Sequence, residues 1–161
     1  MHTKVQNIRY AVVSISDSRY MEKLRGLTVE DGSGMLLRDE LNAEIYELIP
    51  DSPEMIKGLI KHIVEYSDVE CIVLTGGTGL SNRDNTSEVV NELYDKKLEG
   101  FSIVFHKLSY DEVQFSTILS RASAGIYNKK LIYSLPGSVN ACKTGLKIIK
   151  KESGHILGHI E

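Results

Sequence analysis

Short apolar runs alternate along this chain with longer segments of helical periodicity, and this alternation limits the fold to a few architectures. Residues 10–15, 71–75 and 131–135 are nearly continuous apolar runs rich in β-branched side chains. Such runs are typical of strands that are buried on both faces of a sheet. Residues 44–49 form a further predicted strand. Strands that alternate with helices favour an α/β layered domain with a mainly parallel sheet.

Helices are expected in the segments between these strands. The clearest one begins after the Pro50–Pro53 turn, with Ser52 as its N-cap and Pro53 as its first residue. Its apolar side chains recur at helical spacing and form one stripe, made of Met55, Ile56, Leu59, Ile60, Ile63 and Val64. Residues 16–25 are predicted to be a polar loop. Other helices are predicted after Asp31–Gly34, after Asn85 or Thr86, within Gly100–Arg121, and from Val139 to about Lys150.

The length of 161 residues fits one domain that spans residues 1–161. Nineteen basic and twenty-two acidic residues give a formal net charge of -3, which argues against a nucleic-acid partner or an anionic membrane surface. Residues 1–9 carry no apolar targeting segment, and no apolar stretch approaches the length of a membrane span. We therefore expect a cytoplasmic protein. Cys71 and Cys142 lie in apolar runs without a metal-site spacing, so both are predicted to be buried thiols.

Four loops are candidates for ligand binding, because ligands of parallel α/β sheets bind beyond the carboxyl ends of the strands. The strongest candidate is Gly76-Gly77-Thr78-Gly79, which directly follows a predicted strand. Backbone N–H groups in such a loop can turn toward a phosphate without obstruction by Cβ atoms. The spacing matches neither the dinucleotide motif nor the P-loop, and a tight strand exit without a ligand is the alternative. The other three loops are Ser16–Arg19, Pro50–Pro53 and Pro136–Ser138.

The segment Pro136-Gly137-Ser138 repeats this arrangement after the last predicted strand. Ser138 can cap a helix whose N-terminus faces an anion, or it can be a plain cap without a ligand.

Two carboxylates, Asp51 and Asp84, lie in predicted loops on the ligand side of the sheet. A pair of carboxylates close to bound phosphates can hold a magnesium ion, which takes one or two protein carboxylates together with phosphate oxygens and water. Each aspartate alone can instead be a turn or capping residue. Arg83 and Arg121 can pair with phosphate oxygens or point into solvent.

The histidines are expected to be solvated or to cap helices. These residues are His62, His106, His155 and His159. The last two have the spacing of a helical metal pair, but the glutamate and third ligand of the known motif are missing.

The segment Leu74–Gly79, followed by Arg83-Asp84-Asn85-Thr86, resembles the TGGTG...RDxT signature of the MoaB/MogA family of molybdenum cofactor biosynthesis. The resemblance extends over essentially the whole chain. Further matches follow in the family's order, at Val13–Ser18, Asp31–Gly34, Ile49–Asp51, Gly100-Phe101, Leu119–Ala122 with Ala124-Gly125, and Leu135–Ser138.

This resemblance implies a three-layer α/β/α sandwich around a mainly parallel, mixed central sheet. It also implies a domain that binds molybdopterin and Mg-ATP and transfers the adenylyl group to the molybdopterin phosphate, with release of pyrophosphate. A molybdopterin carrier or scaffold without turnover is the alternative function. Relatives assemble as trimers, or as hexamers built from trimers, so a homotrimer or homohexamer is expected.

Carried over onto this sequence, the resemblance implies that Asp84 and Asp51 are catalytic and hold Mg2+. Many relatives carry an acidic residue and then an arginine after Gly100-Phe101, where this chain has Ile103 and His106, so substrate contacts from that helix are expected to differ. The residues implied to contact substrate are Ser16, Asp17, Gly76, Gly77, Thr78, Gly79, Pro136, Gly137 and Ser138. Four aromatic residues can supply either an apolar interface or core packing, namely Phe101, Phe105, Tyr110 and Phe115.

Overall fold

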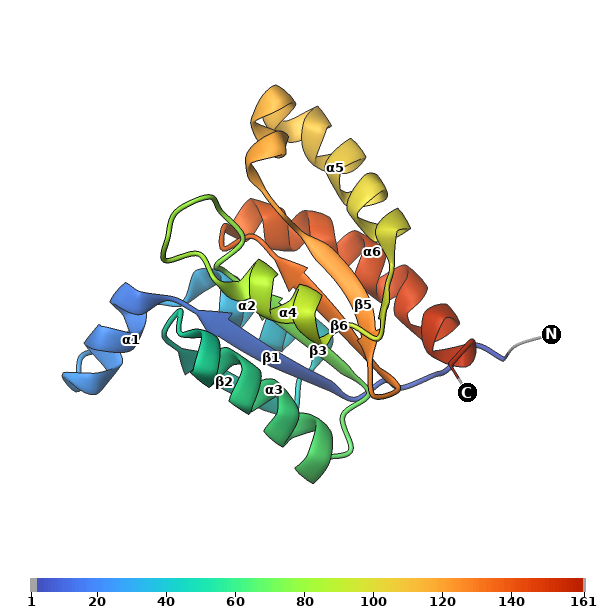
Figure 1. The fold of residues 1–161 in the computed structure, drawn as a ribbon, viewed down its shortest axis with the longest axis horizontal. Coiled ribbons are helices and arrows are strands. Elements are labelled where there is room, and N and C mark those ends of the chain that lie inside the picture. The colour runs from blue at the N-terminus through green and yellow to red at the C-terminus, as the bar shows by residue number, and fades with distance from the viewer. Residues whose placement is uncertain (1–2, 161) are drawn as a thin grey trace.

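The computed structural model describes residues 3–160, which form one six-stranded sheet with helices on both of its faces (Figure 1). Along the chain, the elements are β1 (Tyr10–Ile15), α1 (Asp17–Leu24), α2 (Gly32–Leu41), β2 (Ile45–Ile49), α3 (Pro53–Tyr66), β3 (Cys71–Thr75), α4 (Thr86–Leu93), β4 (Lys96–Lys97), α5 (Glu99–Val113), the 3-10 helix η1 (Gln114–Leu119), β5 (Ser123–Tyr127), β6 (Lys130–Leu135) and α6 (Val139–Gly158).

The strands lie in the order β2-β1-β3-β6-β5-β4. The first four strands of this order are mutually parallel, because β1 pairs in parallel with β2 and β3, and β3 with β6. Of the two remaining strands, β5 is antiparallel to β6, and β4 is antiparallel to β5. The sheet is therefore mainly parallel and mixed, which confirms the predicted fold class.

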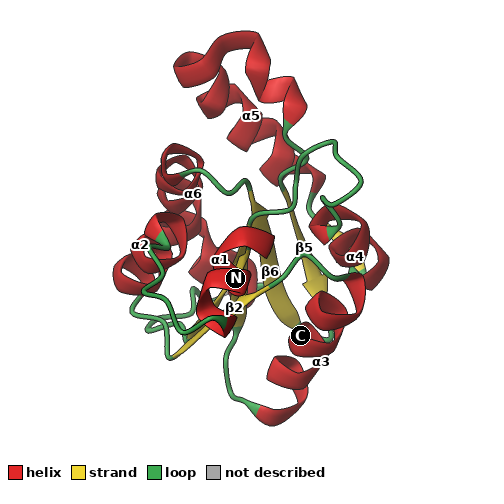
Figure 2. Ribbon diagram, turned by 90° about the vertical axis from the view of Figure 1, so that its left-hand side faces the viewer, coloured by secondary structure: helices red, strands yellow, loops and turns green. Residues whose placement is uncertain are grey.

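Two cores flank this sheet, one on each face. Figure 2 shows α2 and α6 on one side and α3 and α4 on the other. Along β1, Val12 packs in the core under α2, α5 and α6, whereas its neighbours Ala11 and Val13 pack in the core under α3 and α4. This alternation follows from the period of two along a strand, and it explains why β1 is buried throughout and apolar at every position except Ser14. Cys71 and Cys142 are buried free thiols, as predicted.

The segment after β1 was expected to be a polar loop, but residues 17–24 form the helix α1. Ser16 caps this helix, since its side chain accepts a hydrogen bond from the Arg19 N–H. None of the α1 residues is buried. Tyr20, Met21 and Leu24 have helical spacing in α1, but a helix of eight mostly polar residues gives too short a pattern to distinguish it from a polar loop.

Two helix ends differ from the predicted ones, and one strand was not predicted. The helix predicted within residues 100–121 ends at Val113, and η1 follows it. The last helix continues eight residues beyond Lys150, to Gly158. The strand β5 was not predicted, because its sequence SAGIY contains small residues that carry little strand preference. Within residues 3–160, no helix is long and apolar enough to cross a membrane.

Candidate functional site

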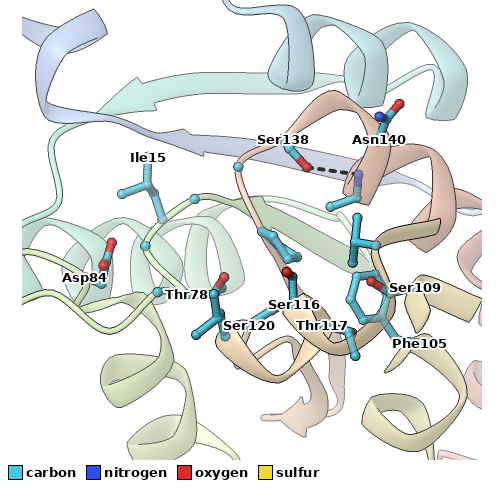
Figure 3. Close-up of a pocket in the computed structure, with 18 of the residues that line it drawn as sticks. Ile15, Thr78, Asp84, Phe105, Ser109, Ser116, Thr117, Ser120, Ser138 and Asn140 are labelled. Carbon is cyan, nitrogen blue, oxygen red and sulfur yellow. Dashed lines mark hydrogen bonds between the residues drawn. The ribbon is translucent and has the colours of Figure 1, made fainter. Parts of the chain in front are cut away.

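A pocket of about 540 Å³ opens at the carboxyl ends of β1, β3 and β6 (Figure 3). Ser16 follows β1, the glycine loop Gly76–Gly79 follows β3, and Pro136–Ser138 follows β6, so three of the four predicted loops meet there. Parallel neighbouring strands bring these loops together, because their carboxyl ends share one edge of the sheet. The fourth loop, which carries Asp51, lies beside the glycine loop without lining the pocket.

The glycine loop has a backbone conformation that requires glycine. Gly76 and Gly77 have φ angles of +107° and +72°, which L side chains rarely adopt. A Cβ atom on Gly77 would collide with the Thr86 side chain and would lie 2.7 Å from Oδ2 of Asp51. The loop therefore passes directly over these polar atoms, and its backbone remains open toward the pocket.

The N-terminus of α6 lines the same pocket as the glycine loop. The side chain of Ser138 accepts a hydrogen bond from the Ala141 N–H at 3.1 Å, and both residues line the pocket. Thr75 at the end of β3 donates its hydroxyl proton to the Pro136 carbonyl at 3.0 Å, which joins the two loops. The positive end of a 20-residue helix thus borders the pocket, where it favours an anion.

Asp51 is a buried carboxylate beneath the glycine loop. Its Oδ1 accepts a hydrogen bond from the Asn85 N–H at 3.0 Å. Burial raises the pKa of Asp51, the hydrogen bonds from Asn85 lower it, and the negative charges of Asp17 and Asp84 raise it further, so that the net direction is upward. A buried carboxylate with acidic neighbours is a place where a cation would relieve an electrostatic cost.

Asp84 reaches the pocket itself (Figure 3). Its Oδ2 accepts a hydrogen bond from the Ser81 N–H at 2.9 Å, which holds the carboxylate against the glycine loop. A Cβ atom on Gly79 would lie 2.7 Å from the same oxygen. The structure therefore brings the two predicted aspartates to one loop, with Asp51 behind it and Asp84 at the pocket surface.

Asp17, a predicted substrate contact, is instead paired with Arg83. The Arg83 guanidinium donates Nε and Nη2 protons to the Asp17 carboxylate at 2.9 and 2.8 Å. The Asp51 N–H donates to the same carboxylate at 2.9 Å. Arg83 holds the pKa of Asp17 below its ordinary value. Neither partner lines the pocket, so this ion pair braces the loops on the outer side of the site.

Arg121 has a role that the sequence left undecided. Its guanidinium donates hydrogen bonds to the Gly79 carbonyl at 3.1 and 2.6 Å and to the Asp84 carbonyl at 3.3 Å. It also pairs with Glu88 on α4. Arg121 therefore fastens the glycine loop to the chain before β5, and its donors face backbone carbonyls rather than the pocket.

The other wall of the pocket comes from α5 and η1. The sequence motifs did not identify most of the pocket residues on this wall. Arg19, the last residue of the predicted Ser16–Arg19 loop, also lines the pocket, and its Nε donates to the Glu30 carbonyl at 2.9 Å. The polar residues on α5 and η1 could have been found only from their position near the segments that match the family. Their polarity alone is ordinary for a protein surface. The polar residues of this wall are Ser109, Glu112, Ser116, Thr117 and Ser120.

The residues that depart from the family pattern lie outside the pocket lining. The His106 ring nitrogens lie 2.7 Å from the Ser102 carbonyl and 3.0 Å from the Ser120 carbonyl, so this histidine joins α5 to the end of η1. His106 is half-buried, and Ser120, whose carbonyl it contacts, is the C-cap residue of η1. Ile103 is exposed on α5.

The donor set around the glycine loop fits a magnesium ion. Asp51 and Asp84 supply carboxylate oxygens, the ligand type that Mg2+ prefers. The Thr86 hydroxyl, on the path of a Gly77 Cβ atom, is buried and has no hydrogen-bond partner among the described residues. Residues 3–160 contain no group of three or more His, Cys, Asp or Glu side chains arranged to hold a metal. A bound ion would therefore complete its coordination with water and ligand oxygens.

Together, the fold and the pocket define an α/β domain with an open pocket between a glycine loop and a helix N-terminus, an arrangement suited to a small anionic ligand. A family model described as "Probable molybdopterin binding domain" matches residues 11–154 of the chain. The protein therefore belongs to this family.

Curated relatives and a solved structure agree with this membership. A Methanocaldococcus jannaschii protein named "Probable molybdopterin adenylyltransferase" is 61% identical over 160 residues, which cover 99% of this chain and 98% of that protein. The "Molybdopterin adenylyltransferase" of Pyrococcus furiosus is 40% identical and covers 96% of this chain and 92% of its own length. The crystal structure of the tungsten cofactor synthesizing protein MoaB from Pyrococcus furiosus superposes with a TM-score of 0.86, at 38% identity, over 97% of this chain and 98% of that one.

Proposed function

We propose that the protein is a molybdopterin adenylyltransferase of molybdenum cofactor biosynthesis, which uses Mg-ATP and releases pyrophosphate. The observation that carries this proposal is the pocket in which the glycine loop, the α6 N-terminus and Asp84 meet. The names of the relatives support the same substrates, molybdopterin and ATP.

In this reaction, an oxygen of the molybdopterin phosphate attacks the α-phosphorus of ATP. A new P–O bond forms, the bond between the α-phosphorus and its bridging oxygen breaks, and pyrophosphate leaves with the electron pair. Because the attacking phosphate is already ionised, no strong base is needed. Catalysis then depends on positioning two anions and on neutralising their charge.

The chain supplies both requirements from its own groups. Backbone N–H groups of Gly77–Gly79 and of the α6 N-terminus donate to phosphate oxygens, whereas the Gly76 N–H is bonded to the Leu135 carbonyl. The guanidinium of Arg19 adds a positive charge at the pocket. The polar wall of α5 and η1 accommodates the remainder of the substrates, and Ser109 and Ser116 are its available hydroxyl donors.

Asp51 and Asp84 are the residues that would hold the magnesium ion. When bound, the ion supplies charge neutralisation at phosphate oxygens. The role of the two aspartates is therefore to bind the metal and orient the substrates, and neither acts as a proton donor. Asp17 acts indirectly in this proposal, because it braces the loop through Arg83 rather than contacting substrate.

Incubation of the purified protein with Mg-ATP and molybdopterin tests the proposal directly. We expect adenylylated molybdopterin and pyrophosphate, with a requirement for Mg2+. The Asp84→Ala variant should lose at least about 100-fold in rate while its circular dichroism spectrum and melting temperature stay close to those of the wild type. Binding of molybdopterin without any ATP-dependent product would instead identify a carrier.

The proposal extends to a homotrimer or a hexamer of trimers. Phe101 and Phe105 belong to the core, but the remaining aromatic candidates Tyr110 and Phe115 are 40% and 74% exposed. They lie on α5 and η1, where further exposed apolar side chains support an interface between copies, namely Ile103, Val104, Val113, Ile118 and Leu119. The cytoplasmic location stays a prediction.

A further inference from the structure

Two histidines meet on the last turns of α6, far from the proposed active site. His155 and His159 are four residues apart, and their Nε2 atoms lie 3.3 Å from each other. Their rings meet edge to face, with centroids 5.0 Å apart. Both residues are exposed at the surface.

This separation matches the geometry of a shared metal ion. Imidazole nitrogens bind Zn2+ at about 2.0–2.1 Å, and two such bonds at a tetrahedral angle place the nitrogens about 3.3–3.4 Å apart. The helix has therefore already brought the two nitrogens to the distance that a tetrahedral ion requires. No rearrangement of the backbone is needed for them to bind one ion together.

Glu152 orients the first of these histidines. Glu152 lies one helical turn before His155, and its Oε2 is 3.1 Å from Nδ1 of His155. A carboxylate that accepts the Nδ1 proton fixes the tautomer in which Nε2 carries the lone pair, and this arrangement is the usual support of a metal-binding histidine. The spacing of the two histidines was evident in the sequence, whereas the role of Glu152 appears only in the structure.

We propose that His155 and His159, oriented by Glu152, bind a divalent transition metal ion such as Zn2+, Ni2+ or Cu2+. Both ligands coordinate through Nε2. Binding replaces the direct contact between the two nitrogens, and His159 then carries its proton on Nδ1. Since the described residues contain no group of three potential ligands, water fills the other positions and leaves them open to a further donor.

This site differs from the proposed magnesium site in both place and chemistry. Ala141 lines the pocket at the beginning of α6, and fourteen residues of helix separate it from His155, which corresponds to about 21 Å. Figure 1 shows the red end of α6 at the edge of the sheet opposite the glycine loop. Imidazole nitrogens suit transition metal ions, whereas carboxylate oxygens suit Mg2+.

Isothermal titration of the full-length protein with Zn2+, Ni2+ or Cu2+ at pH 7.5, in the presence of Mg2+, tests the site. Every protein in the experiment carries His2→Gln, which removes the histidine that lies outside the described residues. His155→Gln and His159→Gln are expected to weaken binding at least tenfold. Glu152→Gln is expected to weaken it about tenfold, as loss of a supporting carboxylate does at other metal sites.

His62→Gln serves as the matched control, because His62 lies on another helix, α3, and stacks on Tyr66. It should leave the affinity unchanged. Equal affinity in the wild type and in the His155 and His159 variants would overturn the proposal, as would a wild type that binds none of the three ions.

Discussion

At the scale of single residues, Asp51 and Asp17 are two neighbouring carboxylates whose surroundings act in opposite directions. Burial raises the pKa of Asp51, whereas the Arg83 guanidinium lowers that of Asp17. A raised pKa means that the folded protein holds the proton more tightly than the unfolded chain, so ionised Asp51 reduces stability at neutral pH. A lowered pKa means that ionised Asp17 contributes stability there.

Neutral substitutions should therefore have opposite effects. Asp51→Asn keeps an oxygen that can accept from Asn85, and it should raise the melting temperature at pH 7 by a few degrees. This gain should shrink as the pH falls through the raised pKa, because the wild-type carboxyl then becomes neutral. Asp17→Asn should lower the melting temperature at pH 7, and this loss should shrink as the pH falls through the lowered pKa. Melting curves between pH 2 and pH 8 measure both effects, and shifts of the same sign at pH 7 would contradict this reasoning.

Gly77 carries a second prediction at this scale. Its φ angle of +72° and the crowding by Thr86 and Asp51 make any side chain unfavourable there. Gly77→Ala should reduce the free energy of unfolding by about 1–3 kcal/mol and greatly reduce nucleotide binding. Gly58→Ala is the control, because a Cβ atom on Gly58 in α3 would meet nothing within 4 Å. That change should raise stability by up to about 1 kcal/mol, as measured by urea unfolding.

The aspartates and glycines of the site could be found from the sequence, because they lie in the matched segments at strand ends. The partners of these residues could not. Arg83 and Arg121 each had two interpretations, and only the fold determined that Arg83 meets Asp17, 66 residues away, and that Arg121 meets the glycine loop. Long-range pairing of this kind leaves no mark on local periodicity.

At the scale of elements, the glycine loop depends on the chain that precedes β5. Arg121 reaches the carbonyls of Gly79 and Asp84 with several donors of one planar group, which a lysine cannot reproduce. Arg121→Lys should therefore lower kcat/KM for ATP roughly 10–100-fold through misplacement of the loop. Steady-state kinetics would detect this loss, and the control is Arg38→Lys, which disturbs a surface pair with Asp39 and a contact with the Tyr46 ring. Unchanged kcat/KM in Arg121→Lys would argue against a positioning role.

Sequence patterns predicted the elements with long apolar runs or stripes and failed for a short polar helix and for a strand of small residues. The parallel strands and α3 are apolar where they pack, so their patterns are clear. Helix α1 buries no residue, and β5 consists largely of small residues. Met55 illustrates the same limit inside a correct helix, since it belongs to the predicted stripe but is 41% exposed.

At the scale of the whole molecule, the exposed apolar face of α5 and η1 should join copies of the chain. Phe115→Asp and Ile118→Asp place charges where the side chains are 74% and 76% exposed, so the fold of one copy should tolerate them. Both variants should shift the protein from an oligomer toward the monomer in light scattering. Leu24→Asp is the control on α1, with a side chain that is 63% exposed. A wild type that is monomeric at all concentrations would contradict the assembly.

The segment formed by α5 and η1 contributes both to the pocket and to the exposed apolar surface. It lines the pocket through Ser109, Glu112 and Ser116 and through the apolar Val113 and Leu119, and it exposes Ile103, Val104, Phe115 and Ile118 outside the pocket. If neighbouring copies hold this segment in place, the output of each active site depends on how many subunits are associated. Dilution would then reduce turnover per subunit. In the cell, the rate of cofactor synthesis would rise more steeply than in proportion to the amount of the enzyme.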